Sequence, residues 1–381
     1  MNTTLQRRYD IDWLRTLAFL LLIGYHIGMY YVFDWGWHIK SATQFVWLQD
    51  VMILSNQWRM SLLFFISALS LGLFQQKYSL NGLIKVRSKR LLIPLIFGML
   101  VIVPPQQYIE LVDGGLLQAD YLGYLAAYYG LPSSLPESAL SHINLTWNHL
   151  WFLPYLFCYT VLLLAFHRVC QKLARIIEEK LTLWQFVLIL IIVMSVIWLT
   201  MRRTFPVTHD LINDWYSHGK YFLVFIAGYV TAFMPHLWQR IIDHRRGLLF
   251  LALCGYALLI ADRHDALSYL AEQFETSLAV RALYAIIVTG NHWCWILTIL
   301  GYAGRYLRQD APMLRYANRA VLAWYLMHQT LIVVIAAWLQ PYALPVPLDF
   351  SIILLATVLG CWLSFEIAKR FRVTRLLFGI Q

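Results

Sequence analysis

Charged residues are scarce in this chain, and their scarcity excludes most soluble folds. Asp, Glu, Lys and Arg make up 13% of the 381 residues, which is about half of their share in an ordinary soluble domain. Apolar residues make up 60% of the chain, and the mean hydropathy is +0.60. This composition leaves no room for a large soluble domain and predicts an all-α, polytopic integral membrane protein.

Cysteine pairs, repeats and linkers are missing as well. The cysteines show no CxxC spacing, so we predict neither a disulfide framework nor a metal site. They are Cys158, Cys170, Cys254, Cys294 and Cys361. No internal repeat or low-complexity segment divides the chain, and we expect residues 1–381 to form a single membrane domain. No small-residue cleavage site follows the first apolar run, so we expect that run to stay as an anchor.

About ten apolar runs are long enough to cross a bilayer as helices of one bundle. They cover residues 11–33, 52–74, 91–111, 147–167, 183–201, 218–238, 247–262, 279–303, 319–339 and 348–368. An even number places both chain ends on one side. With that side taken as cytoplasmic, 22 of the 30 Lys and Arg residues fall in cytoplasmic segments, as the positive-inside rule requires. The longest opposite loop, 110–147, contains no Lys or Arg.

The first apolar run carries two ionisable residues, Arg15 and His26. Eleven residues at about 100° each make almost three turns, so both side chains lie on one helix face, about 16 Å apart along the axis. An ionisable group at membrane depth is costly and usually faces a bundle interior or a water-filled cavity, where it has a function. A structural histidine and an Asp12–Arg15 pair at i, i+3 are the alternatives.

Four motifs follow one another along the chain. They are Arg-x10-His in DWLRTLAFLLLIGYH, FFISAL at 64–69, HLWFL at 149–153 and WYLMH at 324–328. In this order they resemble the signature of the membrane acyltransferase-3 family. One departure is Ala68, where the family usually has Gly. The resemblance spans nearly the whole chain and implies acyltransferase activity with a catalytic role for His26.

Acyl transfer to a hydroxyl needs a base, and histidine is the side chain that titrates close to neutral pH. His26 can deprotonate the acceptor for direct attack on a thioester. It can also accept the acyl group itself as a nucleophile. The sequence leaves both routes open.

Cations near the cytoplasmic side suit acyl-CoA as the acyl donor. Arg15 can hold a phosphate of coenzyme A while the pantetheine arm points inward. Lys85, Arg87 and Arg90 belong to the motif KVRSKR, and the acyltransferase-3 family has a comparable Arg-rich segment beside its third helix. The alternatives are snorkelling of Arg15 to lipid headgroups and ordinary topology determination by KVRSKR.

Six further residues are expected to bind the acceptor. They are Arg59, His149, Trp151, Arg202, Arg203 and His328. A lone cation in the second span needs a partner or a polar ligand. The Trp and His near the start of the fourth span suit a sugar, although an interfacial belt uses the same residue types. The Arg pair after the fifth span departs from positive-inside, which indicates an anionic neighbour, either lipid phosphate or substrate.

Two late polar residues, His328 and Glu366, lie within apolar runs, and one hypothesis is that they orient each other across the bundle. The alternative for Glu366 is an arginine partner near the inner surface. The segment RRT after the fifth span and FxPHL at 233–237 are similar to bacterial enzymes that succinylate periplasmic glucans. This similarity indicates the branch of the family that acts on periplasmic glucans.

The leading hypothesis is a multi-pass O-acyltransferase of the bacterial inner membrane with both termini cytoplasmic. It moves an acetyl or succinyl group from acyl-CoA to a hydroxyl of an extracytoplasmic glycan, with membrane lipid as the surrounding partner. The distribution of the cations follows topology, so nucleic acid is not an expected partner. The alternative is a transporter or flippase of a lipid-linked sugar. Duplicated halves would favour that alternative, and the sequence shows no sign of them.

Overall fold

The computed structural model describes residues 7–75 and 78–380, and this part of the chain is built from helices. Within these described residues, the only β-type pairing is an isolated parallel bridge between Val32 and Phe45. The prediction of an all-α membrane protein is therefore confirmed. The first six residues of the predicted cytoplasmic N-terminus lie outside the described residues.

The helices follow one another along the chain in two halves. The first half contains α1 (Tyr9–Tyr31), α2 (Trp47–Asn56), α3 (Arg59–Gln75), α4 (Leu80–Phe97), the π-helix η1 (Gly98–Ile102), α5 (Pro104–Asp113), α6 (Tyr121–Tyr128), α7 (Glu137–Leu140), the 3-10 helix η2 (Asn148–Trp151), α8 (Phe152–Ala165) and α9 (His167–Lys180). The second half contains α10 (Leu183–Met201), α11 (Trp215–Thr231), α12 (Pro235–Asp243), α13 (Arg245–Arg263), α14 (Ser268–Gln273), α15 (Leu278–Tyr306), α16 (Pro312–Leu339), the 3-10 helix η3 (Gln340–Tyr342), α17 (Val346–Ala368) and α18 (Arg372–Leu377).

The chain forms two compact units, each assembled from separate stretches. Unit 1 contains the described residues within Met1–Ala18, Ile53–Ile84 and Cys158–Leu314. Unit 2 contains Phe19–Met52, Lys85–Phe157 and, as described to residue 380, Arg315–Gln381. The prediction of a single membrane domain stays a prediction.

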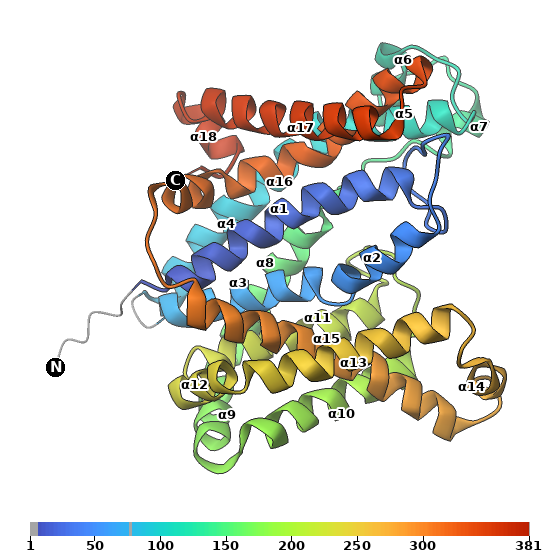
Figure 1. Ribbon diagram of the computed structural model, residues 1–381. Coiled ribbons are helices and arrows are strands. Elements are labelled where there is room, and N and C mark those ends of the chain that lie inside the picture. The colour runs from blue at the N-terminus through green and yellow to red at the C-terminus, as the bar shows by residue number, and fades with distance from the viewer. Residues whose placement is uncertain (1–6, 76–77, 381) are drawn as a thin grey trace. The chain divides into compact units, whose positions relative to one another are not determined.

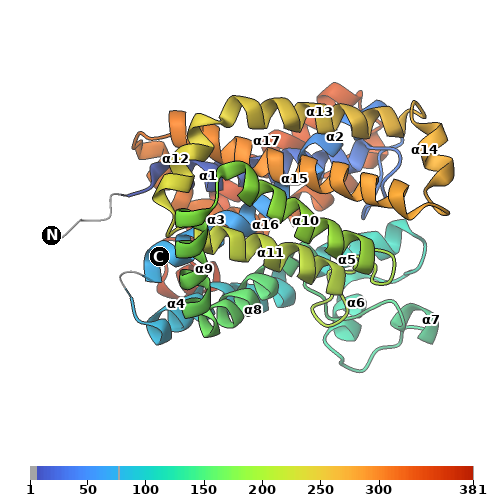
Figure 2. The ribbon, with the colours of Figure 1, turned by 90° about the horizontal axis from the view of Figure 1, so that it is seen from below.

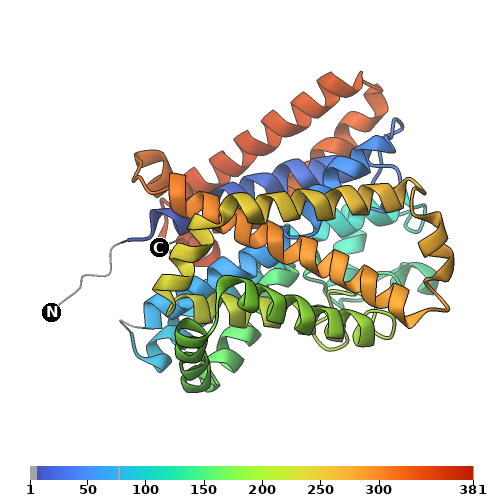
Figure 3. The ribbon, with the colours of Figure 1, turned by 60° about the horizontal axis from the view of Figure 1, so that its bottom comes forward.

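Unit 1 is a set of long helices packed around α15 and α11. Helix α15 packs against α10, α12 and α13, and α11 packs against α3, α9 and α10. Figure 2 shows α10 beside α11, and Figure 3 shows α13 (yellow) beside α15 (orange). A Cβ on Gly228 of α11 would lie 2.3 Å from the carbonyl oxygen of Phe65 on α3. Glycine at this position therefore allows the two backbones to approach closely, as is common between membrane helices.

Unit 2 has a core formed by α1, α16 and α17. Ile27 and Tyr30 of α1 pack with Ile332 and Val333 of α16 and with Ile353 of α17. These three helices are visible in the upper part of Figure 1. The apolar faces are built from residues spaced three and four apart, the spacing that places side chains on one side of a helix.

Seven helical segments are long and apolar enough to cross a membrane. They are Tyr9–Tyr31, Trp47–Gln75, Asn148–Ala165, Leu183–Met201, Leu278–Tyr306, Pro312–Tyr342 and Val346–Ala368. Each overlaps one of the ten predicted spans. An eighth arises if α11 and α12 are one broken span. Within the described residues the structure thus supports seven or eight spans by length and composition, rather than ten.

Three predicted spans differ from straight membrane helices. The run 218–238 is wrong as one helix, because α11 ends at Thr231 and α12 begins at Pro235 with a bend of 106°. The run 91–111 is divided by η1 and restarts at Pro104, since proline lacks the N–H that would continue a helix but is tolerated in the first turn. The run 247–262 is helical within α13 but has Arg and Asp residues at its ends.

Candidate functional site

Two histidines from α1 and α16 meet in unit 2. His26 Nδ1 lies 3.0 Å from His328 Nε2. The two rings stack with centroids 5.0 Å apart. His328 is 1% exposed, whereas His26 is half-buried. The structure therefore joins the first motif and the WYLMH motif, whose histidines were predicted to have separate roles in catalysis and acceptor binding.

The hydrogen bonds of this pair assign its protons. His328 Nδ1 lies 2.8 Å from the carbonyl oxygen of Tyr325. A carbonyl only accepts, so Nδ1 carries the proton and, in the neutral ring, Nε2 is an acceptor. His26 Nδ1 must then donate to His328 Nε2. The lone pair of a neutral His26 is consequently on Nε2, the one ring nitrogen from which a neutral imidazole of this tautomer can accept a proton.

His149 of the HLWFL motif supports the same helix. Its Nδ1 accepts from Gln106 Nε2 at 3.2 Å, and its Nε2 donates to the Leu326 carbonyl at 3.1 Å. The Tyr325 hydroxyl in turn donates to the His149 carbonyl at 2.6 Å. His149 is 7% exposed, and its ring lies edge-to-face with that of His328, at 5.4 Å between centroids. These bonds connect η2 to the part of α16 that carries His328.

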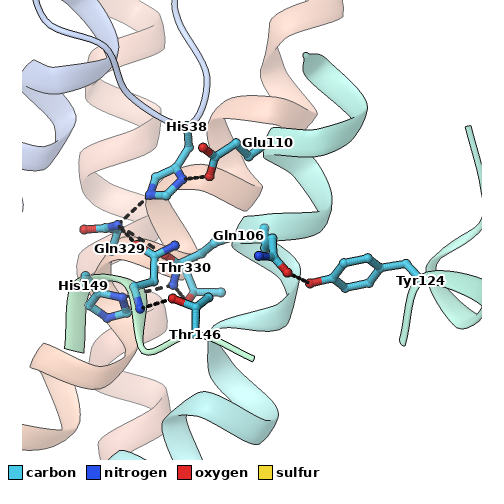
Figure 4. Close-up of polar contacts among 10 residues, drawn as sticks. His38, Gln106, Glu110, Tyr124, Thr146, His149, Gln329 and Thr330 are labelled. Atoms are coloured by element: carbon cyan, nitrogen blue, oxygen red, sulfur yellow. Dashed lines mark hydrogen bonds and ion pairs between the residues drawn. The ribbon is translucent and has the colours of Figure 1, made fainter. Parts of the chain in front are cut away.

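Buried amides extend this network from His149 to α5 (Figure 4). Gln329 Nε2 donates to Gln106 Oε1 at 3.2 Å and to His38 Nε2 at 2.8 Å. His38 Nδ1 donates to Glu110 Oε2 at 2.5 Å. Thr330 Oγ1 accepts from Gln106 and donates to the carbonyl of Ile102. Because buried polar groups are costly unless they are satisfied, this network fixes the registry of α16 against η1, η2 and α5.

A tyrosine cluster adjoins the network on the opposite side of α5. The Tyr124 hydroxyl on α6 donates to Gln107 Oε1 at 3.0 Å (Figure 4). Rings of Tyr108 and Tyr121 lie within 5.9 Å of the Tyr124 ring, measured between centroids. Burial raises the pKa of Tyr124, so this hydroxyl stays protonated and donates. The segment Tyr121–Tyr128 within the loop 110–147 is therefore a helix anchored to α5.

The residues of the amide network were not predicted from the sequence. They are His38, Gln106, Gln107, Glu110, Gln329 and Thr330. A signal was present, because the QQ pair after Pro105 and the HQT run in α16 place polar side chains inside apolar stretches. Such side chains are expensive in a membrane and usually have partners or functions.

Arg15 lies in unit 1, and two groups contact its guanidinium. Nη2 donates to Ser70 Oγ at 2.8 Å, and Nη1 lies 3.7 Å from Asp12 Oδ1. The i, i+3 pair, which was the alternative role for Arg15, is thus present. The Arg15 side chain is 24% exposed, so part of it remains open to solvent or ligand. Ser70 directly follows the FFISAL motif, which connects the first and second motifs.

The cationic segment of α4 lies beside the chain's C-terminal end in unit 2. Lys85 is exposed, and Arg87 and Arg90 are half-buried. A Cβ on Gly379 would lie 3.1 Å from the carbonyl oxygen of Arg90. Ile380 packs with residues of α16 and α17. The basic segment and the C-terminal end thus lie together.

The remaining acceptor candidates are distributed over both units. Trp151 in unit 2 is 8% exposed and lies edge-to-face with Tyr155. In unit 1, Arg59 begins α3 and is 8% exposed. Arg202 lies over the Trp198 ring at 5.0 Å, and Arg203 forms an ion pair with Glu275. Their roles in binding the acceptor stay predictions.

The suggested contact between His328 and Glu366 is wrong. Glu366 accepts from Lys369 Nζ at 2.6 Å and from the Tyr316 hydroxyl at 2.8 Å. A cation one turn away satisfies this carboxylate more easily than a distant histidine or arginine does. Among the described residues no group of three His, Cys, Asp or Glu side chains is placed to hold a metal ion.

Comparisons with known proteins cover almost the whole chain. A family model described as an acyltransferase domain matches residues 8–366. The chain is 25% identical over 394 aligned residues to glucans biosynthesis protein C of Escherichia coli O1:K1, of strain SMS-3-5 and of strain K12. These alignments cover 98% of this chain and 94% of each relative. No solved structure matches the chain.

Proposed function

Because the chain belongs to the acyltransferase family whose model covers residues 8–366, we propose that it transfers an acetyl or succinyl group from acyl-CoA to a hydroxyl of an extracytoplasmic glycan. The observation that carries the proposal is the chain of bonds from the Tyr325 carbonyl through His328 to His26. The name of the Escherichia coli relatives, glucans biosynthesis protein C, supports a glucan as the acceptor. The match to an acyltransferase family counts against the transporter hypothesis.

In the direct route, His26 acts as a general base. The acceptor hydroxyl gives its proton to His26 Nε2 as its oxygen attacks the thioester carbonyl carbon. The carbon–sulfur bond then breaks, and the leaving thiolate takes the proton from the imidazolium. His328 stabilises the charged ring, because its Nε2 accepts from His26 Nδ1–H throughout the step.

In the covalent route, His26 Nε2 attacks the thioester carbonyl and the thiolate of coenzyme A leaves. The acyl group is then on the imidazole. In a second step the acceptor oxygen attacks the acyl carbon, the bond from that carbon to Nε2 breaks, and the hydroxyl proton passes to the coenzyme A thiolate. The same tautomer serves both routes, since each requires the lone pair on Nε2. The proposal therefore includes His26 as the reacting residue and keeps the two routes as alternatives.

Acyl-CoA is proposed to bind through the cations near the cytoplasmic surface. Arg15 lies eleven residues before His26 on α1, which corresponds to about 16 Å along the helix. An extended pantetheine arm suits such a separation. Lys85, Arg87 and Arg90 are proposed to contact the nucleotide phosphates, and Trp151 the acceptor.

One experiment tests the proposed reaction as a whole. Cell-envelope glycans from a strain with the gene and from a strain without it are compared by mass spectrometry. The expected result is a mass increment that depends on the gene and that defines both the acyl group and the glycan. Identical glycan spectra from the two strains would remove support for the acceptor class.

Replacing Arg15 by Ala is expected to weaken acyl-CoA binding more than the chemical step. A remote phosphate contact supplies binding energy that is similar in the ground and transition states, so KM rises while kcat changes little. Lys should restore binding only in part, because it lacks the planar fork of Arg. Isothermal titration with coenzyme A measures this directly. Parental affinity in Arg15→Ala would contradict the phosphate contact.

The proposed topology predicts opposite labelling of two engineered cysteines. Leu116→Cys, exposed in the loop 110–147, should react with an impermeant maleimide applied to spheroplasts. Lys89→Cys, exposed on α4, should react only after the membrane is permeabilised. The background carries Cys254→Ser, because Cys254 is an exposed thiol. Protection of residue 116 together with labelling of residue 89 in intact spheroplasts would show that the orientation is opposite to the one that the cations predict.

A further inference from the structure

A small cavity in unit 1 is lined by three arginines. Its volume is about 250 Å³, and its walls are Trp198, Leu199, Arg202, Arg203, Phe274 and Arg281. Arg202 lies over the Trp198 ring at 5.0 Å, and Arg203 lies over the Phe274 ring at 5.5 Å. The aromatic rings thus hold two guanidinium groups in place at the cavity wall.

The charge of this cavity is not balanced by the described residues. Arg203 forms an ion pair with Glu275. For Arg202 and Arg281 the described chain supplies no carboxylate within ion-pair distance, and Arg281 Nε is buried without an acceptor. Three cations against one carboxylate leave a site that favours an anion.

The cavity lies where two candidate membrane spans end. Arg202 and Arg203 directly follow Leu183–Met201, and Arg281 is in the first turn of Leu278–Tyr306. Trp198, in the last turn of α10, is a residue type typical of the membrane–water interface. By the length and composition of these two spans, the arginines are at the depth of lipid headgroups.

We propose that this cavity binds a phosphate group presented by the headgroup of an anionic phospholipid. The planar guanidinium of one arginine can bind two phosphate oxygens at once. Basic pockets between membrane helices bind lipid headgroups. A volume of about 250 Å³ is below the range of roughly 300–1,000 Å³ for larger ligands. It suits a single charged headgroup rather than a glycan chain. Arg202 and Arg203 are then lipid ligands, which is one of the two alternatives that the sequence left open.

The test measures lipid binding by the purified full-length protein in detergent, without an acyl donor. Phosphatidylglycerol, phosphatidylcholine and inorganic phosphate are each titrated, and bound lipid is counted by native mass spectrometry. We expect phosphatidylglycerol to bind most tightly. Arg281→Gln and Arg202→Gln should each weaken it about fivefold, the change that corresponds to ~1 kcal/mol per cation. Arg305→Gln, exposed in the last turn of α15, is the matched control and should bind as the parent does.

A variant that is expected to bind lipid more tightly distinguishes a specific site from a general loss of structure. Glu275→Gln removes the carboxylate that competes for Arg203, so it should bind phosphatidylglycerol more tightly than the parent. Equal binding by the parent, Arg281→Gln and Arg202→Gln would overturn the site. Tight inorganic phosphate binding without any lipid preference would overturn the lipid as the source. A protein that transfers no acyl group can still pass this test, so it is independent of the proposed function.

Discussion

Replacing His26 by Ala should abolish acyl transfer and leave the protein folded. The proposed reaction needs the lone pair on His26 Nε2, and Ala supplies no base or nucleophile at that position. The expected loss is on the order of 10²- to 10⁴-fold in kcat if the histidine is a general base. A larger loss is expected for the covalent route, because the variant then lacks the intermediate itself.

The measurement uses purified, monodisperse protein, acyl-CoA and acceptor glycan. His244→Ala is the matched control, since His244 is an exposed histidine on the turn between α12 and α13, and its variant should keep parental activity. Quenched parent protein incubated with acyl-CoA alone then distinguishes the routes. An acyl adduct on His26 supports the covalent route, and its absence supports direct transfer. Near-parental transfer by folded His26→Ala would contradict both.

The positions of the helices follow from the sequence because a membrane helix must be long and apolar. All ten predicted runs are mainly helical in the structure. Two of the three errors occur at prolines, where a long apolar run conceals a break in the helix. Pro235 begins a new helix at a sharp angle, and Pro104 restarts one after a π-helix. Both residues were visible in the sequence, and the backbone rule for proline would have divided these runs.

The histidine pair was predictable only in part. Helical geometry places Arg15 and His26 on one face. The cost of burying an ionisable side chain in a membrane predicts a function for His328. Their contact joins residues 302 positions apart, and no local rule reports which distant helices meet. The amide network has the same origin, since Gln106 and Gln329 find each other only when α5 and α16 pack. Burial cost predicts that partners exist without identifying them.

His328 is expected to be a positioning residue for His26. With Ala at position 328, His26 Nδ1–H loses its acceptor, and the ring is no longer held in the tautomer that has its lone pair on Nε2. Loss of a tautomer-fixing partner in a catalytic histidine lowers kcat strongly. We expect a fall of about 10²-fold or more in His328→Ala, with a smaller change in KM. The Tyr325 carbonyl also loses its donor, so some stability is lost as well.

His328→Gln separates positioning from a structural role, because its amide oxygen can accept from His26 Nδ1–H near the place of the imidazole Nε2. We expect His328→Gln to recover much of the activity that His328→Ala loses. Equal inactivity of two folded variants, or parental activity of His328→Ala, would show that His328 does not hold the tautomer of His26.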